Sequence, residues 1–103
     1  MNTKWYCFEQ NPSGGGYIGP KYILVQANSA SDANDLVQNH GAYFDGCDDE
    51  RDCECCGDRW DRHYHEDYST DSPCIYWKPV EPSDDVKFVY SDGRVDGGEK
   101  ICA

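Results

Sequence analysis

The sequence predicts one small α+β domain over residues 1–103, in which a single helix packs on a mainly antiparallel sheet. Three observations carry this prediction. The length of 103 residues suits one domain. Short apolar and aromatic runs recur along the chain and are separated by residues that favour turns. One segment, residues 30–39, has the three-and-four apolar spacing of a helix, and it follows two expected strands.

Residues 5–8 and 22–27 are the first two expected strands. Both are rich in aromatic or β-branched residues, and the stretch between them is rich in Gly and Pro. The run of glycines at 14–16 precedes a strand, whereas a phosphate-binding loop needs a helix directly after it. We therefore expect these glycines to form a hairpin loop.

The helix is expected from residue 30 to about residue 39. Ser29 and Asp32, three residues apart, form a start that resembles a capping box. Gly41 provides the natural end, because glycine tolerates the positive φ of a helix C-cap.

The remaining strands are expected to be short. We place them at residues 42–44, 60–65, 75–77 and 86–90, with a return strand near residues 95 and 100–101. Over 60–65 the alternation puts Asp61, His63 and His65 on one face.

The charge of the chain is strongly acidic. Twenty acids against nine Lys and Arg give a net charge of −11. This field disfavours binding to nucleic-acid phosphates or to an anionic membrane surface. The acids concentrate between residues 45 and 71, which indicates either a solvated face or a surface for a basic partner, including one that imitates DNA. The candidate contact residues are Asp48, Asp49, Glu50, Asp52 and Glu54.

Seven cysteines are many for this length, and their number is odd. The first residues lack the apolar stretch of a secretory signal, and no apolar run has the ~18 residues of a membrane helix. We therefore expect an intracellular chain whose cysteines are reduced thiols or metal ligands rather than disulfides.

Cys53, Cys56 and the following Gly57 have the spacing of a zinc knuckle. Two thiolates three positions apart on a tight turn can bind one ion, and the glycine permits the backbone shape. Zinc prefers four ligands in a tetrahedron, so one knuckle supplies half of the set. The sequence thus predicts a zinc staple in the fold.

The other two ligands come from outside the knuckle. Cys47 is the expected third ligand, and His63 or His65 the fourth, with Cys74 and Cys55 as alternatives. Four protein ligands would make the zinc structural, whereas three ligands and a water would permit hydrolysis. The surrounding carboxylates would raise the pKa of a thiol, which disfavours a cysteine nucleophile. The pattern favours a binding protein over an enzyme.

Several segments resemble a family of small proteins of tailed bacteriophages for which no activity is established. The resemblance is carried by residues 10–15, 27–34, 43–47 and 52–60 and covers most of residues 5–77, whereas the part from Val80 onward does not match. Its most specific part is the motif Cys53-x-Cys55-Cys56-Gly57-Asp58-Arg59-Trp60. It implies expression in the cytoplasm of a bacterial host.

Composition and resemblance together lead to one functional expectation. The chain is expected to be a small acidic zinc protein that binds and inhibits or redirects a host protein, such as a defence factor or a nucleic-acid-handling factor. The alternatives are a metal-dependent enzyme, a protein that sequesters a small ligand, and a minor component of the virion.

Overall fold

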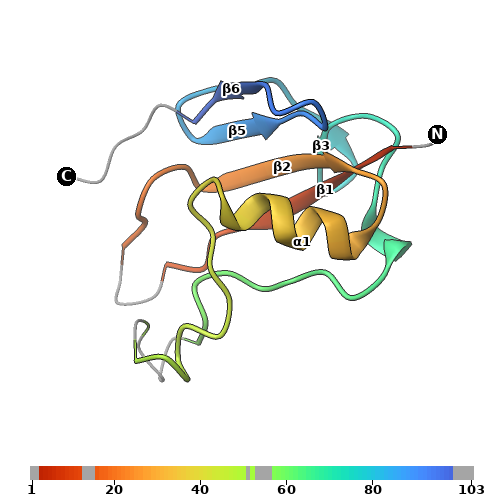
Figure 1. Cartoon of the computed structure of the whole chain (residues 1–103). Coiled ribbons are helices and arrows are strands. Elements are labelled where there is room, and N and C mark those ends of the chain that lie inside the picture. The colour runs from red at the N-terminus through yellow and green to blue at the C-terminus, as the bar shows by residue number, and fades with distance from the viewer. Residues whose placement is uncertain (1–2, 13–15, 51, 53–56, 99–103) are drawn as a thin grey trace.

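A computed structural model describes residues 3–12, 16–50, 52 and 57–98. Its main element is a four-stranded sheet with the strand order β1-β2-β5-β6. The strands are β1 (Lys4–Glu9), β2 (Tyr22–Ala27), β5 (Val86–Val89) and β6 (Val95–Gly97). Figure 1 shows helix α1 (Ala30–Gln38) lying across one face of this sheet.

The first two strands and the helix confirm the prediction closely. Ser29 is the N-cap, and its hydroxyl accepts a hydrogen bond from the backbone N–H of Asp32 at 3.1 Å. Gly41, just beyond the helix, has a φ of +110°. Ala30, Ala33 and Val37 are buried, so the apolar stripe of the helix faces the sheet as expected.

The sheet is mainly antiparallel, with one exception. β1 pairs with β2 and β5 pairs with β6 in antiparallel fashion, whereas β2 and β5 are parallel. A parallel pair needs a crossover between its strands, and the chain from β2 to β5 contains α1. The antiparallel hairpin of β5 and β6 confirms the expected strand at 86–90 and its return strand near residue 95. The expected continuation at 100–101 lies outside the described residues.

The core has two parts, one on each face of the sheet. Beneath α1 the larger part includes Tyr6, Phe8 and Val25, with Trp60 from a later segment. On the other face Trp5, Leu24 and Phe88 form a smaller cluster. A second hairpin, β3 (Cys74–Ile75) and β4 (Lys78–Pro79), lies on that face (Figure 1). The molecule is therefore built as helix, sheet and small hairpin.

Two of the expected strands are wrong. Residues 42–44 and 60–65 run without a strand ladder, although Phe44 and Trp60 are buried. Trp60 is 2% exposed and Tyr64 is 80% exposed, so these two side chains do not share one face as the alternation suggested. Ala42, Phe44 and Trp60 are buried because they pack in the core cluster beneath α1, which needs no strand pairing.

The expected strand at 75–77 is also wrong in its centre. Tyr76 and Trp77 form the two-residue turn between β3 and β4, with φ angles of +51° and +68°. A short η2 turn (Glu66–Tyr68) precedes this hairpin. No helix in the described ranges is long and apolar enough to cross a membrane.

Candidate functional site

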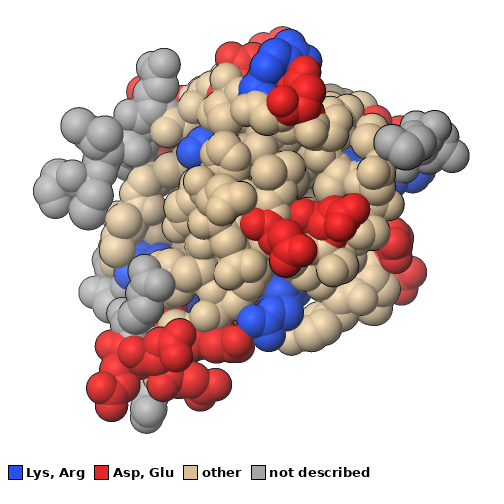
Figure 2. All heavy atoms as spheres, in the orientation of Figure 1, with Lys and Arg blue, Asp and Glu red and all other residues tan. Residues whose placement is uncertain are grey.

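A turn at residues 46–50, here called the acidic turn, carries three consecutive acidic residues. Asp48, Asp49 and Glu50 on it are exposed. In Figure 1 this part of the chain projects from the sheet and helix, and in Figure 2 acidic side chains gather at the same corner. Within the part of the chain that the structure describes, no ion pair involves these three carboxylates. Their charge therefore faces solvent.

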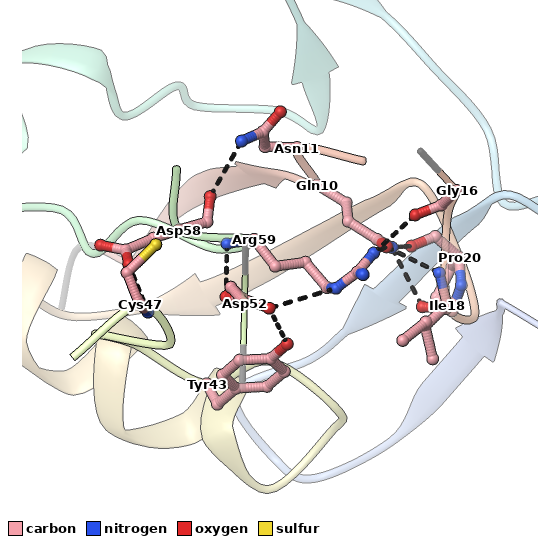
Figure 3. Close-up of polar contacts among 10 residues, drawn as sticks. All are labelled: Gln10, Asn11, Gly16, Ile18, Pro20, Tyr43, Cys47, Asp52, Asp58 and Arg59. Carbon is pink, nitrogen blue, oxygen red and sulfur yellow. Dashed lines mark hydrogen bonds and ion pairs between the residues drawn. The ribbon is translucent and has the colours of Figure 1, made fainter. Parts of the chain in front are cut away.

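The acidic turn is anchored by a polar frame, which consists of the buried Gln10, Asp52 and Arg59 and the half-buried Tyr43 (Figure 3). The Asp52 carboxylate accepts hydrogen bonds from the Tyr43 hydroxyl at 2.5 Å and from the backbone N–H of Arg59 at 2.7 Å. It also forms an ion pair with the Arg59 guanidinium, with 3.7 Å between Oδ1 and Nε. Burial, and secondarily the bond to Asp52, raises the pKa of Tyr43, which keeps its hydroxyl protonated as the donor.

Gln10 connects the frame to the loop that follows β1. Its side-chain oxygen accepts from Arg59 Nη1 and from the backbone N–H of Ile18, both at 2.7 Å. Its nitrogen donates to the carbonyl oxygens of Ile18 at 3.0 Å and Pro20 at 2.9 Å. Arg59 Nη1 also donates to the Gly16 carbonyl at 2.7 Å. The frame thus fixes the loop and the acidic turn relative to each other.

The ends of the acidic turn are held by further contacts. The backbone N–H of Cys47 donates to Asp58 Oδ1 at 2.9 Å, and this bond lowers the pKa of Asp58. The backbone N–H of Asp52 donates to the Gly46 carbonyl at 3.0 Å. At the outer end, Arg62 pairs with Asp45 at 2.7 Å. The chain therefore closes on itself between residues 45 and 58.

A glycine is required at position 46, because the backbone there passes very close to the side chains of Asp52 and Tyr43. A Cβ at this position would lie 1.9 Å from Asp52 Oδ2 and 2.8 Å from Tyr43 Cε2. Both contacts are far inside van der Waals distance, so only a glycine lets the backbone approach the carboxylate this closely.

The predicted acidic contact residues divide into three cases. Asp48, Asp49 and Glu50 are at the surface. Asp52 is 9% exposed and bonded to Tyr43 and Arg59, so its predicted role as a contact residue is corrected to a structural one. A buried carboxylate needs such partners, because burying it unpaired costs several kcal/mol, roughly 3–5 when one partner is removed. Glu54 lies outside the described residues.

The predicted zinc ligands are described only in part. Cys53 and Cys56, with the alternative Cys55, lie outside the described residues. Cys47 is half-buried beside Asp58. The alternative Cys74 is half-buried in β3, with its sulfur 3.7 Å from the Ser72 hydroxyl. Among the described residues, no three His, Cys, Asp or Glu side chains gather into a metal-binding group.

The two candidate histidines differ in their surroundings. His63 packs edge-on against Tyr6 and Phe8, with ring centroids 5.5 and 4.8 Å apart. Its Nε2 donates to the Cys7 carbonyl at 2.7 Å, and burial lowers its pKa. His65 is exposed, with Nδ1 3.3 Å from Asp67 Oδ2. In the structure, His63 contributes to packing along β1, whereas His65 stays accessible.

Sequence reasoning missed two features. The first is the ion pair of Arg59 with Asp52, seven positions away. The second is a pocket of about 220 Å³ between β1 and the β3–β4 hairpin, whose lining includes Glu9, Tyr76 and Trp77. The sequence held a local signal for each feature: few arginines stand among many acids between residues 45 and 71, and a Tyr-Trp pair stands shortly before a proline.

Comparison with known proteins gives one positive result. A family described as "Domain of unknown function (DUF7296)" matches residues 3–99. No curated protein and no solved structure matches the chain. Because the match covers nearly the whole length, the chain belongs to this DUF7296 family.

Proposed function

We propose that this protein is a small acidic binding protein, stabilised by zinc, that occupies a basic surface of a host protein. The observation that carries the proposal is the arrangement of Asp48, Asp49 and Glu50. Three exposed carboxylates stand on a turn whose first two residues are held in place, Gly46 through its carbonyl to the backbone N–H of Asp52 and Cys47 through its backbone N–H to Asp58. Charges held in place lose less conformational entropy on binding than charges on a flexible chain.

The net charge of −11 also supports a basic partner. An acidic surface raises the association rate with a basic protein and repels nucleic acid and other acidic proteins. The acidic turn is the contact surface in this proposal, and a host protein that normally holds DNA has the matching charge.

Zinc is the proposed scaffold of the segment next to the acidic turn. Cys47, Cys53 and Cys56 are the proposed thiolate ligands, and His63 or His65 is the fourth ligand. His65 is accessible, whereas His63 already donates from Nε2 to the Cys7 carbonyl and has only Nδ1 left for an ion. The resemblance of the cysteine motif to bacteriophage proteins supports an activity in the cytoplasm of a bacterial host, which is part of this proposal.

The acidic turn can be tested by removing its charge without changing its shape. We expect the triple variant Asp48→Asn, Asp49→Asn, Glu50→Gln to lose at least about tenfold in affinity for the partner, because three favourable charge contacts disappear. The partner would first be captured from a bacterial lysate by the tagged wild-type protein, then purified and measured by calorimetry at two salt concentrations.

A second triple variant provides the matched control. Asp35, Asp84 and Asp96 are exposed and lie away from the acidic turn. Changing all three to Asn alters the net charge from −11 to −8, as the first variant does. We expect the control to keep most of the affinity. Equal loss in both variants would show that only the overall charge matters, and full binding by the acidic-turn variant would refute the proposal.

A further inference from the structure

A pocket with aromatic walls lies on the side of the molecule that carries the β3–β4 hairpin. Its volume is about 220 Å³. Four of its lining residues are large aromatics, namely Tyr22, Tyr68, Tyr76 and Trp77. Tyr68, Tyr76 and Trp77 are 66%, 69% and 65% exposed. Large aromatic side chains gathered at the surface are typical of binding sites, because they offer much contact area at little entropic cost.

The hairpin that carries two of these aromatics is strained. A two-residue turn with positive φ at both positions favours Asn-Gly, because other side chains crowd the backbone there. Tyr76 and Trp77 occupy these positions with φ of +51° and +68°. Such strain costs stability and is typically found where the side chains serve a function. Because neither aromatic is buried, core packing does not explain them.

The charge of the pocket is negative. Glu9 is the only carboxylate among its described lining residues, and no Lys or Arg lines it. The Tyr76 hydroxyl donates to Glu9 Oε1 and holds the carboxylate at the pocket wall. Cys7, also in the lining, is uncharged at neutral pH, because burial raises its pKa to about 12.

Aromatic rings around a carboxylate form a site for an organic cation, since a ring face attracts positive charge. The molecule already uses this chemistry beside the pocket. Lys21 Nζ lies 5.5 Å from the ring centroid of Tyr22 and 5.4 Å from that of Tyr17.

We propose that the pocket formed by Tyr22, Tyr68, Tyr76, Trp77 and Glu9 binds the cationic end of a lysine or arginine side chain presented by a partner protein. This inference rests on the proposed function in one respect, the basic character of the partner. It adds a second contact, separate from the acidic turn, that recognises a single side chain.

Size and surroundings favour a protein side chain over a larger free ligand. Clefts for drug-sized molecules usually have ~300–1,000 Å³, so about 220 Å³ suits the end of one side chain. A second, more polar hollow of about 550 Å³ shares four lining residues with the pocket and extends past Gln10 and Asn11. It would take the backbone of the peptide that presents the cation. The shared residues are Cys7, Glu9, His63 and Tyr68.

The test uses blocked tripeptides and the full chain. Trp77 is the exposed tryptophan of the three, since Trp5 and Trp60 are buried, so its indole N–H resonance reports on the pocket. We expect a Gly-Lys-Gly peptide to shift this resonance saturably, with affinity at least about tenfold above that of the same peptide with norleucine, its uncharged analogue. Equal binding of the norleucine peptide would overturn the cation site. Methylammonium binding as tightly as the lysine peptide would overturn the protein side chain as occupant.

Two variants localise the effect. Glu9→Gln keeps an acceptor for the Tyr76 hydroxyl but removes the charge, and we expect about tenfold weaker binding of the lysine peptide. The double variant Tyr76→Asn, Trp77→Gly removes both aromatics and suits the turn. We expect it to fold with an unchanged or higher melting temperature and to lose binding, which is then followed by the shifts of backbone N–H resonances around Glu9. Wild-type affinity in either variant would overturn the proposal.

The acidic-turn variant separates this inference from the proposed function. The Asp48, Asp49 and Glu50 substitutions leave every lining residue of the pocket intact. If that variant binds both the lysine peptide and the partner as the wild type does, the role of the acidic turn as a contact surface is refuted and the pocket is not. A pocket that binds no lysine peptide, in a protein whose partner binding still depends on the acidic turn, would refute the pocket alone.

Discussion

At the scale of one residue, His63 was predicted as a zinc ligand, and the structure shows that its side chain also stabilises the fold. Its ring packs nearly perpendicular to the rings of Tyr6 and Phe8, and Nε2 donates to the Cys7 carbonyl. Its own backbone N–H and C=O are bonded to the side chain of Asn34 on α1, at 2.8 and 2.6 Å. These contacts fix the segment that carries Trp60 beneath the helix without a strand ladder.

We therefore expect the stability of the protein to fall as the pH drops below the ordinary pKa of histidine. Burial lowers the pKa of His63 from 6.5, so in mild acid the unfolded chain binds a proton that the folded chain does not. The stabilisation is complete above about pH 6.5 and is lost as the pH falls through the folded pKa. His40, whose pKa is also lowered by burial, acts in the same direction.

Two measurements check this expectation. Thermal unfolding between about pH 7 and 5 should show a smaller loss of stability in His63→Gln than in the wild type. Proton NMR should give His63 a titration midpoint below 6.5. A midpoint at or above 6.5 would contradict the expectation. A zinc ion on His63 would abolish its titration, so the experiment also tests this residue as the fourth ligand.

At the scale of one element, the β3–β4 hairpin combines a turn of unsuitable residues with packing that holds the hairpin in place. Its pairing is short, with Cys74 opposite Pro79 and Ile75 opposite Lys78, and its turn residues are poor formers of that turn. The hairpin is held by Ile75, which packs against the core cluster of Trp5, Leu24 and Phe88. Because this packing stabilises the hairpin, its two turn residues can keep unfavourable backbone angles.

We expect the double variant Tyr76→Asn, Trp77→Gly to be more stable than the wild type. Relief of two positive-φ side chains is worth about 1–3 kcal/mol each, against about 0.5–1.5 kcal/mol for the lost hydrogen bond to Glu9. A net gain of ~1 kcal/mol raises the melting temperature of a domain of this size by about 4–8 °C. Calorimetry measures it directly.

The single variant Trp77→Gly is the control for the hydrogen bond. It leaves Tyr76 and its bond to Glu9 in place and relieves one strained position, so we expect an intermediate melting temperature. A melting temperature below that of the wild type in both variants would show that these aromatics stabilise the fold.

The whole molecule combines a modest core with a polar extension. The buried apolar side chains lie on the two faces of the sheet, whereas the described residues between 45 and 58 are held by Asp52, Asp58 and Arg59 through hydrogen bonds and an ion pair. A bound metal ion would stabilise this extension, because structural zinc sites contribute about 10–16 kcal/mol of apparent binding energy in small peptides.

We expect one zinc ion per chain in a native mass spectrum of the protein purified under reducing conditions. Cys53→Ser and Cys56→Ser should each lose the metal, and a chelator should lower the melting temperature of the wild type. Cys7→Ser is the control, because Cys7 lies in β1 with a strongly raised pKa and should not bind zinc. A wild-type protein without metal would refute the zinc proposal.

The sequence by itself determined the elements whose signals are local. The strands Lys4–Glu9 and Tyr22–Ala27 and the helix after Ser29 follow from apolar periodicity, capping and glycine, which act within a few residues. The exposure of Asp48, Asp49 and Glu50 was equally predictable from their charge.

Only the tertiary structure decided the contacts between distant parts of the chain. Asp52 resembles its acidic neighbours in the sequence, but it is buried because Arg59 and Tyr43 lie within bonding distance once the chain closes. The pocket likewise joins Glu9 to Tyr76, which are 67 positions apart. Local propensity carries no information on such pairs, because the free energy of burying a charge or placing a ring depends on partners that folding brings together.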